Sequence, residues 1–270
     1  MLAKKAFVIS LSVLLFSPFQ RQFAEAATPK TRASMGGQAV SLTEARELVL
    51  MALALPPENR LQALRGQASQ ATLGNSAFQA LEQLAFDQSQ GLQVRWRALI
   101  SLAQVYPDRA QPILNQAARS QEWFMRNAAL VAMSSMPRDY ALVWARRLSR
   151  DPALVVRTAA IQLLAEVGAS DVEPLLWEQL YAAENFHQGQ SLFVRRHIVK
   201  ALASQARPGQ EARFIQILQE ADARLHPFAI QALEKISGRS LTQEGATVSQ
   251  VKNQWLEWWG QTQNSQSLSL

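Results

Sequence analysis

The chain has 270 residues, of which 48% are hydrophobic and 18% charged, and it contains no cysteine. This composition excludes an intrinsically disordered chain, and the lack of cysteine excludes disulfides, thiol chemistry and cysteine-ligated metal sites. The formal charge is +6 and the sequence pI is about 10.1.

The first 26 residues have the layout of a secretory signal peptide. A basic start (Lys4 and Lys5) precedes an apolar run over residues 6–16, and residues 24–26 (Ala-Glu-Ala) form a small-x-small cleavage signal. The run is too short to span a bilayer of about 30 Å, which favours cleavage over an uncleaved anchor. Cleavage there removes three basic residues and one acid, which leaves a net charge of +4.

The signal peptide predicts a bacterial protein that is exported to the periplasm or outside the cell. After cleavage we expect no membrane-spanning segment. A net charge of +4 is smaller than that of a typical dedicated nucleic-acid-binding protein, so we expect no nucleic-acid partner.

Two segments precede the regular part of the chain. The composition of residues 27–40, rich in small and polar residues, predicts a flexible linker. Residues 41–75 are predicted to form a degenerate N-terminal capping hairpin. Ser41 or Thr43 could cap its first helix, and Pro57 begins the second.

Residues 76–237 contain one pattern five times. An apolar residue precedes a basic residue, and small or apolar residues follow three, four and seven positions later. The basic positions are Arg95, Arg126, Arg157, Arg195 and His226, which are separated by steps of 31, 31, 38 and 31 residues. This spacing places the apolar residues on one stripe of a helix.

An apolar-striped segment lies upstream of each such helix. These segments cover residues 76–86, 109–119, 140–149, 172–183 and 211–220. Each unit is therefore predicted to be a helical hairpin of about 31 residues. One hairpin cannot bury its stripe alone, so the hairpins are expected to stack.

The D…VRxxA[IL]xxL arrangement of residues 76–237 resembles the HEAT repeat family. The resemblance implies an all-α, right-handed α-solenoid of about five to six stacked helical hairpins. It also implies that the arginines are structural, each paired with an acid in the preceding turn to form a ladder. The candidate pairs are Asp87 with Arg95, Glu122 with Arg126 and Asp151 with Arg157, and Arg195 holds the same position in the fourth unit.

Residues 238–262 resemble the closing segment of many bacterial HEAT proteins. A helix ends at Gly238, and a short loop leads to a final helix with Trp255, Trp258 and Trp259. We expect these rings to cover the exposed end of the last hairpin, because an uncapped repeat end would aggregate. A ligand cage is the alternative. Residues 263–270 are expected to be a disordered tail.

The sequence contains no constellation that predicts catalysis. His187, His197 and His226 lack the spacing of a helical zinc site, and no phosphate-binding or nucleophile motif occurs. We therefore expect no enzymatic activity, no cofactor and no metal.

Two enzyme classes with HEAT-like repeats fit the sequence poorly. Bilin lyases are disfavoured because the chain lacks cysteine and carries a signal peptide. HEAT-like DNA glycosylases, for which Trp96, Arg97 and Arg126 are the nearest match, are disfavoured by export and by the small net charge.

In HEAT stacks the second helix of each hairpin lines the concave side, which predicts a partner-binding surface there. The positions one and five residues after the ladder position share a face that the buried stripe does not use. The candidate residues are Trp96, Ile100, Asn127, Val131, Thr158, Gln162, Arg196, Lys200 and Gln231.

This face is apolar in its first two units and cationic in the fourth, which suits a protein segment with a hydrophobic anchor and an acidic stretch. The ordinary alternative is that Trp96 packs on the adjacent hairpin and that the two cations are only solvated.

The fourth turn is seven residues longer than the others and is a second candidate. It contains Asn185, Phe186 and His187, and insertions in solenoids often mark a binding edge. We therefore expect a monomeric, non-enzymatic protein–protein interaction scaffold of the cell envelope or periplasm. The alternatives are an accessory or regulatory subunit of an envelope enzyme complex, and a binder of envelope glycan or anionic lipid.

Overall fold

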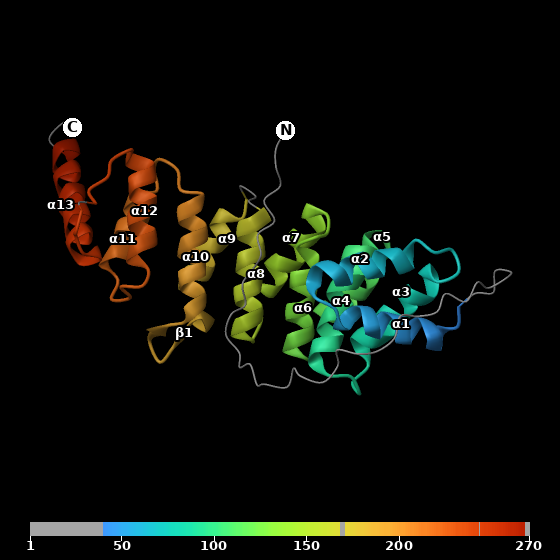
Figure 1. Cartoon of the computed structure of the whole chain (residues 1–270). Coiled ribbons are helices and arrows are strands. Elements are labelled where there is room, and N and C mark those ends of the chain that lie inside the picture. Colours follow the sequence, from blue (N-terminus) through green and yellow to red (C-terminus); the bar gives the residue numbers. More distant parts are fainter. Residues whose placement is uncertain (1–39, 168–170, 243, 268–270) are drawn as a thin grey trace. The chain divides into compact units, whose positions relative to one another are not determined.

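A computed structural model describes residues 40–167, 171–242 and 244–267 (Figure 1). These residues form 13 α-helices, one short 3-10 helix and two strands of two residues each. The all-α prediction is confirmed, and the small β-hairpin is an addition that was not expected. The predicted signal peptide (1–26) and all of the predicted linker except Val40 lie outside the described residues.

The bounds of the helices follow the repeat pattern. They are α1 (Leu42–Ala54), α2 (Pro57–Ala68), α3 (Gly74–Phe86), α4 (Leu92–Val105), α5 (Pro107–Ala118), α6 (Trp123–Met133), α7 (Arg138–Leu148), α8 (Leu154–Val167), α9 (Glu173–Tyr181), α10 (Phe193–Ser204), α11 (Glu211–Gln219), α12 (His226–Ser237) and α13 (Val248–Ser267). The strands β1 (Phe186–His187) and β2 (Gln190–Ser191) pair antiparallel between α9 and α10.

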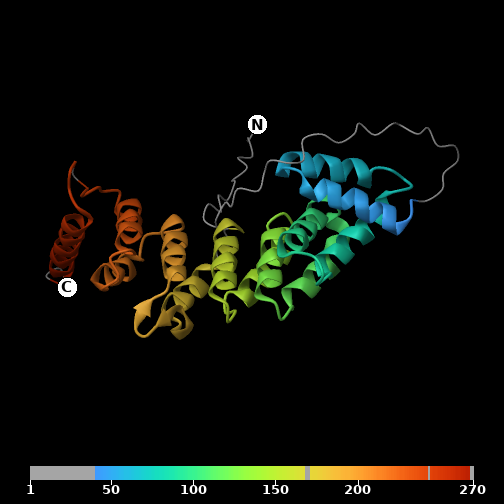
Figure 2. The same ribbon diagram turned by 60° about the horizontal axis from the view of Figure 1, so that its bottom comes forward.

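Five helix pairs, from α3–α4 to α11–α12, correspond to the five repeated segments. The second helices α4, α6, α8, α10 and α12 pack on one another in that order, and α13 packs on α11 and α12. Both views show these hairpins following one another in chain order (Figures 1 and 2). The helices are thus stacked in a series, as the sequence period predicts, and are not gathered around one common centre.

Helix α8 shows why the repeated stripe produces a stack. Val156, Ala160, Ile161 and Leu164 are almost completely buried, and α8 packs on α6, α7 and α10. A leucine-sized side chain gains about 1.5–3 kcal/mol from full burial, and an isolated hairpin would leave half of this stripe in water. The small Ala160 lets a neighbouring helix approach closely.

The arginines do form a ladder, but its register differs from the predicted one. Three of the arginines each pair with an acid in the turn that joins the two helices of the next hairpin. The pairs are Arg95 with Glu122 (2.5 Å), Arg126 with Asp151 (2.6 Å) and Arg195 with Glu220 (2.6 Å). The predicted pairs of Asp87 with Arg95, Glu122 with Arg126 and Asp151 with Arg157 are therefore wrong by one repeat.

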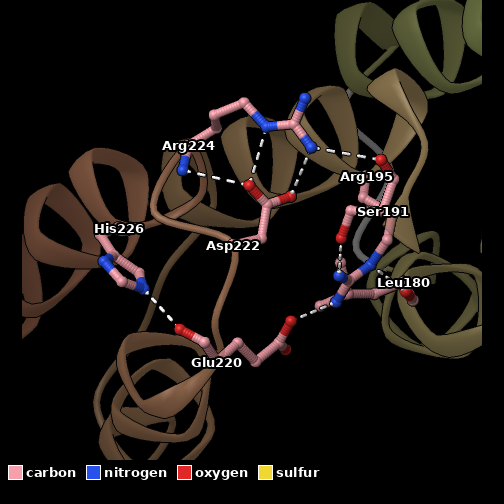
Figure 3. Close-up of polar contacts among 7 residues, drawn as sticks. All are labelled: Leu180, Ser191, Arg195, Glu220, Asp222, Arg224 and His226. Atoms are coloured by element: carbon pink, nitrogen blue, oxygen red, sulfur yellow. Dashed lines mark hydrogen bonds and ion pairs between the residues drawn. The ribbon is translucent and has the colours of Figure 1, made fainter. Parts of the chain in front are cut away.

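The register differs because part of each basic side chain contacts backbone oxygens of its own hairpin. Arg195 Nε donates to the Leu180 carbonyl oxygen (2.8 Å) at the end of its own first helix, while Nη2 reaches forward to Glu220 (Figure 3). Side chains in the first turn of a helix point back toward the helix start, so the outer nitrogens face the next hairpin. His226, at the last position, has Nε2 at 3.0 Å from the carbonyl oxygen of Glu220 in its own turn.

The third rung of the ladder contains no carboxylate. Arg157 is 4% exposed and donates to the backbone oxygens of Asp151 (2.7 Å), Pro152 (3.0 Å) and Glu184 (2.7 Å). Its Nε donates to Asn185 Oδ1 (2.9 Å). A buried guanidinium is therefore solvated here by four neutral oxygens, which take the place of water.

At the start of the ladder, Asp87 pairs with Arg46 of α1. Its titration allows this pair to be tested by unfolding at low pH. Its carboxylate accepts from the hydroxyl (2.6 Å) and backbone nitrogen (2.9 Å) of Ser89 and from Arg46 of α1. The Ser89 hydroxyl, followed by Arg46, lowers the pKa of Asp87 from 3.8 to about 2. Because the pKa is lower in the folded state, the stabilisation is complete above pH 4 and is lost as the pH falls toward 2.

We expect Asp87→Asn to lower stability at pH 7 and to flatten the loss of stability between pH 4 and pH 2. Urea midpoints at several pH values in this window would measure the effect. A variant whose midpoint falls with acid as steeply as the wild type would contradict the assignment of this titration to Asp87.

The front end of the stack has the predicted cap. Ser41 Oγ accepts a hydrogen bond from the backbone nitrogen of Glu44 (3.2 Å), which satisfies one free donor of α1.

At the other end, Gly238 closes α12 in the left-handed conformation (φ 67°), and α13 covers the last hairpin. Trp255 of α13 is fully buried, and its ring meets Trp258 edge-on at 5.1 Å. The helix continues to Ser267, so residues 263–267 are helical and not the disordered tail expected from composition; residues 268–270 lie outside the described part.

Candidate functional site

The second helices share an outward face that their buried stripes do not use, and we call it the second-helix face. It is formed by the outward residues of α4, α6, α8, α10 and α12. The predicted partner-binding residues lie here at one and five positions after each ladder position. Trp96, Ile100, Asn127, Val131, Thr158 and Gln162 are half-buried, whereas Arg196, Lys200 and Gln231 are exposed.

Polar and aromatic contacts join neighbouring helices on this face. Gln162 Nε2 of α8 lies 3.3 Å from His197 Nδ1 of α10. The guanidinium of Arg196 in α10 lies over the Phe228 ring of α12, 5.5 Å from its centroid. These contacts make the surfaces of consecutive hairpins continuous.

Trp96 and Ile100 offer less to a partner than predicted. Both side chains pack against the hydrophobic core, so much of their surface is already removed from water. The ordinary alternative for Trp96, packing within the protein, describes its environment better than a free anchor does.

A row of exposed apolar side chains begins the second-helix face of four consecutive hairpins. Leu92, Trp123, Val155 and Phe193 are 57%, 52%, 43% and 55% exposed. Each lies in the first turn of its helix, three or four residues before a predicted face residue. These four residues are called the apolar row below. Exposed apolar residues that occur singly need no explanation, but one in the first helical turn of each of four adjacent repeats, two or three residues before the ladder arginine, does.

Sequence reasoning missed the apolar row because the count along each helix began after the arginine. The stretches "GLQVRWR" and "QEWFMRN" carry the signal, an apolar residue three positions before the arginine and outside the core stripe. Extending the helical face by one turn toward the helix start would have included it.

The second-helix face becomes cationic toward the end of the stack. Arg196 and Lys200 of α10 and Lys235 of α12 are exposed, and Lys235 Nζ donates to the carbonyl oxygen of Ser204 (2.6 Å). Burial and then the charges of Lys200 and Arg196 lower the pKa of His197, which lies between them. The local potential on this part of the face is therefore positive.

The long fourth turn is folded more tightly than a binding loop would be. Asn185 is 1% exposed, and its amide donates to the Gln179 carbonyl oxygen (2.8 Å) while its oxygen accepts from Arg157. The prediction that Asn185 contacts a partner is therefore wrong, because the residue completes the third rung of the ladder. Phe186 is half-buried under the Arg195 guanidinium at 4.4 Å, and His187 is exposed on the β-hairpin.

A cleft of about 430 Å³ lies between this β-hairpin and the turn that precedes α12 (Figure 3). Its two guanidinium groups already have acidic partners, Arg195 with Glu220 (2.6 Å) and Arg224 with Asp222 (2.8 Å). Arg224 also donates to the backbone oxygen of Ser191 (3.2 Å), which ties the turn to strand β2. These contacts link the fourth and fifth hairpins across the cleft. Its lining residues include no catalytic set of nucleophile and general base.

Within residues 40–167, 171–242 and 244–267, no group of three or more His, Cys, Asp or Glu side chains could hold a metal ion. Among the described helices, none combines the length and the hydropathy that crossing a membrane requires.

No protein-family model matches the chain, and no curated protein matches its sequence. Two solved structures show a distant likeness. One is the crystal structure of an engineered protein, with 16% identity, a TM-score of 0.43, and coverage of 72% of this chain and 96% of the other. The second is the complex of CpcE and CpcF of phycocyanin lyase from Nostoc sp. PCC7120, with 14% identity and a TM-score of 0.36. This match covers 86% of this chain and 99% of the other.

Likenesses this distant do not identify a family. The chain is a helical-repeat protein on the evidence of its own helix order and packing.

Proposed function

We propose that the chain is a non-enzymatic scaffold that binds a partner protein on its second-helix face. The apolar row carries this proposal, because Leu92, Trp123, Val155 and Phe193 expose apolar surface in the first turns of four successive second helices. A helical-repeat fold is compatible with this role, and with that of an accessory subunit that contacts an enzyme through the same surface.

The signal-like first 26 residues support a place in the periplasm or outside the cell, where this partner would be met.

The apolar row has the composition of an interface anchor. Burying the exposed half of the Trp123 ring removes about 100 Å² of apolar surface, a gross gain of about 2–3 kcal/mol. Association itself costs about 4–15 kcal/mol, so one ring would not hold a partner. Several anchors on adjacent hairpins, engaged by one segment, would together supply a gain of the same order as this cost.

Photo-crosslinking in the source organism tests the proposal. A benzophenone amino acid at position 123 is expected to crosslink to a discrete partner protein. The control position is Val143, which is 64% exposed but lies on α7, a first helix. A scaffold should give several adducts and an accessory subunit one stoichiometric enzyme. Equal labelling of the same proteins from both positions would contradict binding at the apolar row.

Removal of the apolar row should weaken the partner recovered in this way. We expect Trp123→Ser with Phe193→Ser to lower its affinity at least about 30-fold, as for hot-spot residues. Val143→Ser should change the affinity less than about twofold. Because more than half of each of these three residues is exposed, the melting temperatures should stay close to that of the wild type.

A further inference from the structure

The distribution of charge between the hairpins shows where cations lack acidic partners. Four arginines of first helices and turns pair with acids of neighbouring segments: Arg46 with Asp87, Arg146 with Asp171, Arg150 with Glu178, and Arg207 with Glu173. Other first-helix arginines of the described residues, Arg109, Arg138, Arg147 and Arg213, form no ion pair. The four pairs neutralise the surface on which they lie.

The second-helix face of α10 and α12 lacks such neutralisation. Helix α10 contains Arg196 and Lys200 and no acidic residue, and neither forms an ion pair in the described part of the chain. Glu234, the acid of α12, accepts from the hydroxyls of Ser240 (2.7 Å) and Thr242 (2.9 Å), so it is engaged with the segment after α12.

The positive region continues directly from the apolar row. Phe193 is the last member of the row, and its ring meets the His197 ring edge-on at 4.7 Å. Arg196 and Lys200 lie three and seven residues after Phe193, on the same face of α10. Lys235 extends the region onto α12. An apolar surface and a cationic surface therefore meet at Phe193.

We infer that the partner is an amphipathic protein segment that lies along the second-helix face in one direction. Its apolar side chains cover the row from α4 to α10, and its acidic end lies over Arg196, Lys200 and Lys235. This inference rests on the proposed function, because it assigns the chemistry and the direction of the segment that the scaffold binds.

The spacing of the row supports a peptide chain over a lipid surface or a nucleic acid. Packed helices lie about 8–10 Å apart, which equals about five to seven residues of a helical ligand or about three of an extended one. One apolar residue per helix suits side chains that recur at such a spacing. Nucleic acids would instead require phosphate-binding cations along the whole face.

Panning of a displayed library of random peptides, each about 20 residues long to span the row, against the purified full chain tests the inference. The selected pool is expected to be enriched in Asp and Glu near one end and in apolar residues over the remainder. Peptides from this pool then serve as labelled probes in fluorescence anisotropy.

Two matched variants decide whether charge on this face is responsible. Arg196→Glu with Lys200→Glu should weaken the selected acidic peptides at least about tenfold, and panning against it should remove the acidic enrichment. Arg146→Glu with Arg150→Glu makes the same change in net charge on paired cations of another surface, and binding should change less than about twofold. Arg196→Gln with Lys200→Gln gives a milder variant in case charge reversal lowers stability.

The outcomes separate the inference from the proposed function. Selected peptides without an acidic excess that still require Trp123 and Phe193 would overturn the inference and leave the proposed function standing. If no selected peptide depends on the apolar row, both are overturned. Vesicles that contain phosphatidylglycerol form a second arm. Binding of these vesicles that requires Arg196 and Lys200, without acidic peptides in the pool, would overturn the inference in favour of a lipid.

Discussion

Replacing Arg157 with alanine is expected to lower the free energy of unfolding by about 3–5 kcal/mol, because each buried acceptor left without a donor costs about 1–3 kcal/mol. The guanidinium satisfies the backbone oxygens of Asp151, Pro152 and Glu184 and the side-chain oxygen of Asn185. Without it, the buried acceptors on Asp151 and Asn185 have lost water and gained no donor. In a domain of this size the melting temperature should fall by about 10 °C, which calorimetry and urea unfolding would measure.

Arg150→Ala is the matched control for this experiment. Arg150 pairs with Glu178, and both side chains are more than half exposed. Exposed pairs of this kind contribute about 0–1 kcal/mol, so the control should unfold close to the wild type. Partner binding per folded molecule should be unchanged in both variants. A loss in Arg157→Ala no larger than that of the control would show that the third rung does not hold the stack together.

Replacing Trp255 with alanine is expected to cost about 3–5 kcal/mol, as for other buried aromatic residues. The indole is completely buried, and α13 packs on both helices of the last hairpin. Because each repeat contacts only its neighbours, the loss should first free α13 and then loosen α11 and α12. Limited proteolysis between α12 and α13 should therefore accelerate before global unfolding does.

Trp255→Phe serves as the control for the loss of the ring. In the described part of the chain the buried Nε1 of Trp255 has no hydrogen-bond partner, so phenylalanine removes an unsatisfied donor while it retains an aromatic ring. We expect less than half of the destabilisation of Trp255→Ala. Equal losses in the two variants would mean that the indole shape, and not aromatic burial, closes the stack.

The helical hairpins could be predicted from the sequence because burial repeats with the helical period. The stripe around Val156, Ala160 and Leu164 can be buried in only one way on a helix, and similar stripes recur along the chain. The end caps at Ser41 and Gly238 could also be predicted, because they depend on local backbone chemistry.

The ladder partners could not be assigned from spacing alone. Arg126 has Glu122 four residues before it and Asp151 25 residues after it, and spacing alone does not decide which acid it faces. The direction in which the side chain leaves the first helical turn decides in favour of Asp151. For the same reason the role of Asn185 could not be predicted. In the sequence it is part of a polar insertion, whereas in the structure it is buried and accepts a hydrogen bond from Arg157.

The candidate site was predicted in position but not in its exposed anchors. The outward positions of α10, Arg196 and Lys200, follow from helical periodicity and are exposed. Trp96 is half-buried in core packing, whereas Trp123 projects further into water. Side-chain exposure depends on the neighbouring hairpin, which a periodicity argument on one helix does not include.

The direction of the ladder limits where the chain can be shortened or lengthened. Arg95, Arg126 and Arg195 each obtain a carboxylate from the hairpin that follows. A truncation after the first, second or fourth hairpin would therefore leave a guanidinium without its counter-ion. The last hairpin has His226 at the ladder position, and its Nε2 contacts the Glu220 carbonyl oxygen of its own turn rather than an acid of a further hairpin. A protein extended by a sixth hairpin could accept arginine at position 226 only if the added turn supplied an acid or, as at the third rung, neutral oxygens that accept from the guanidinium.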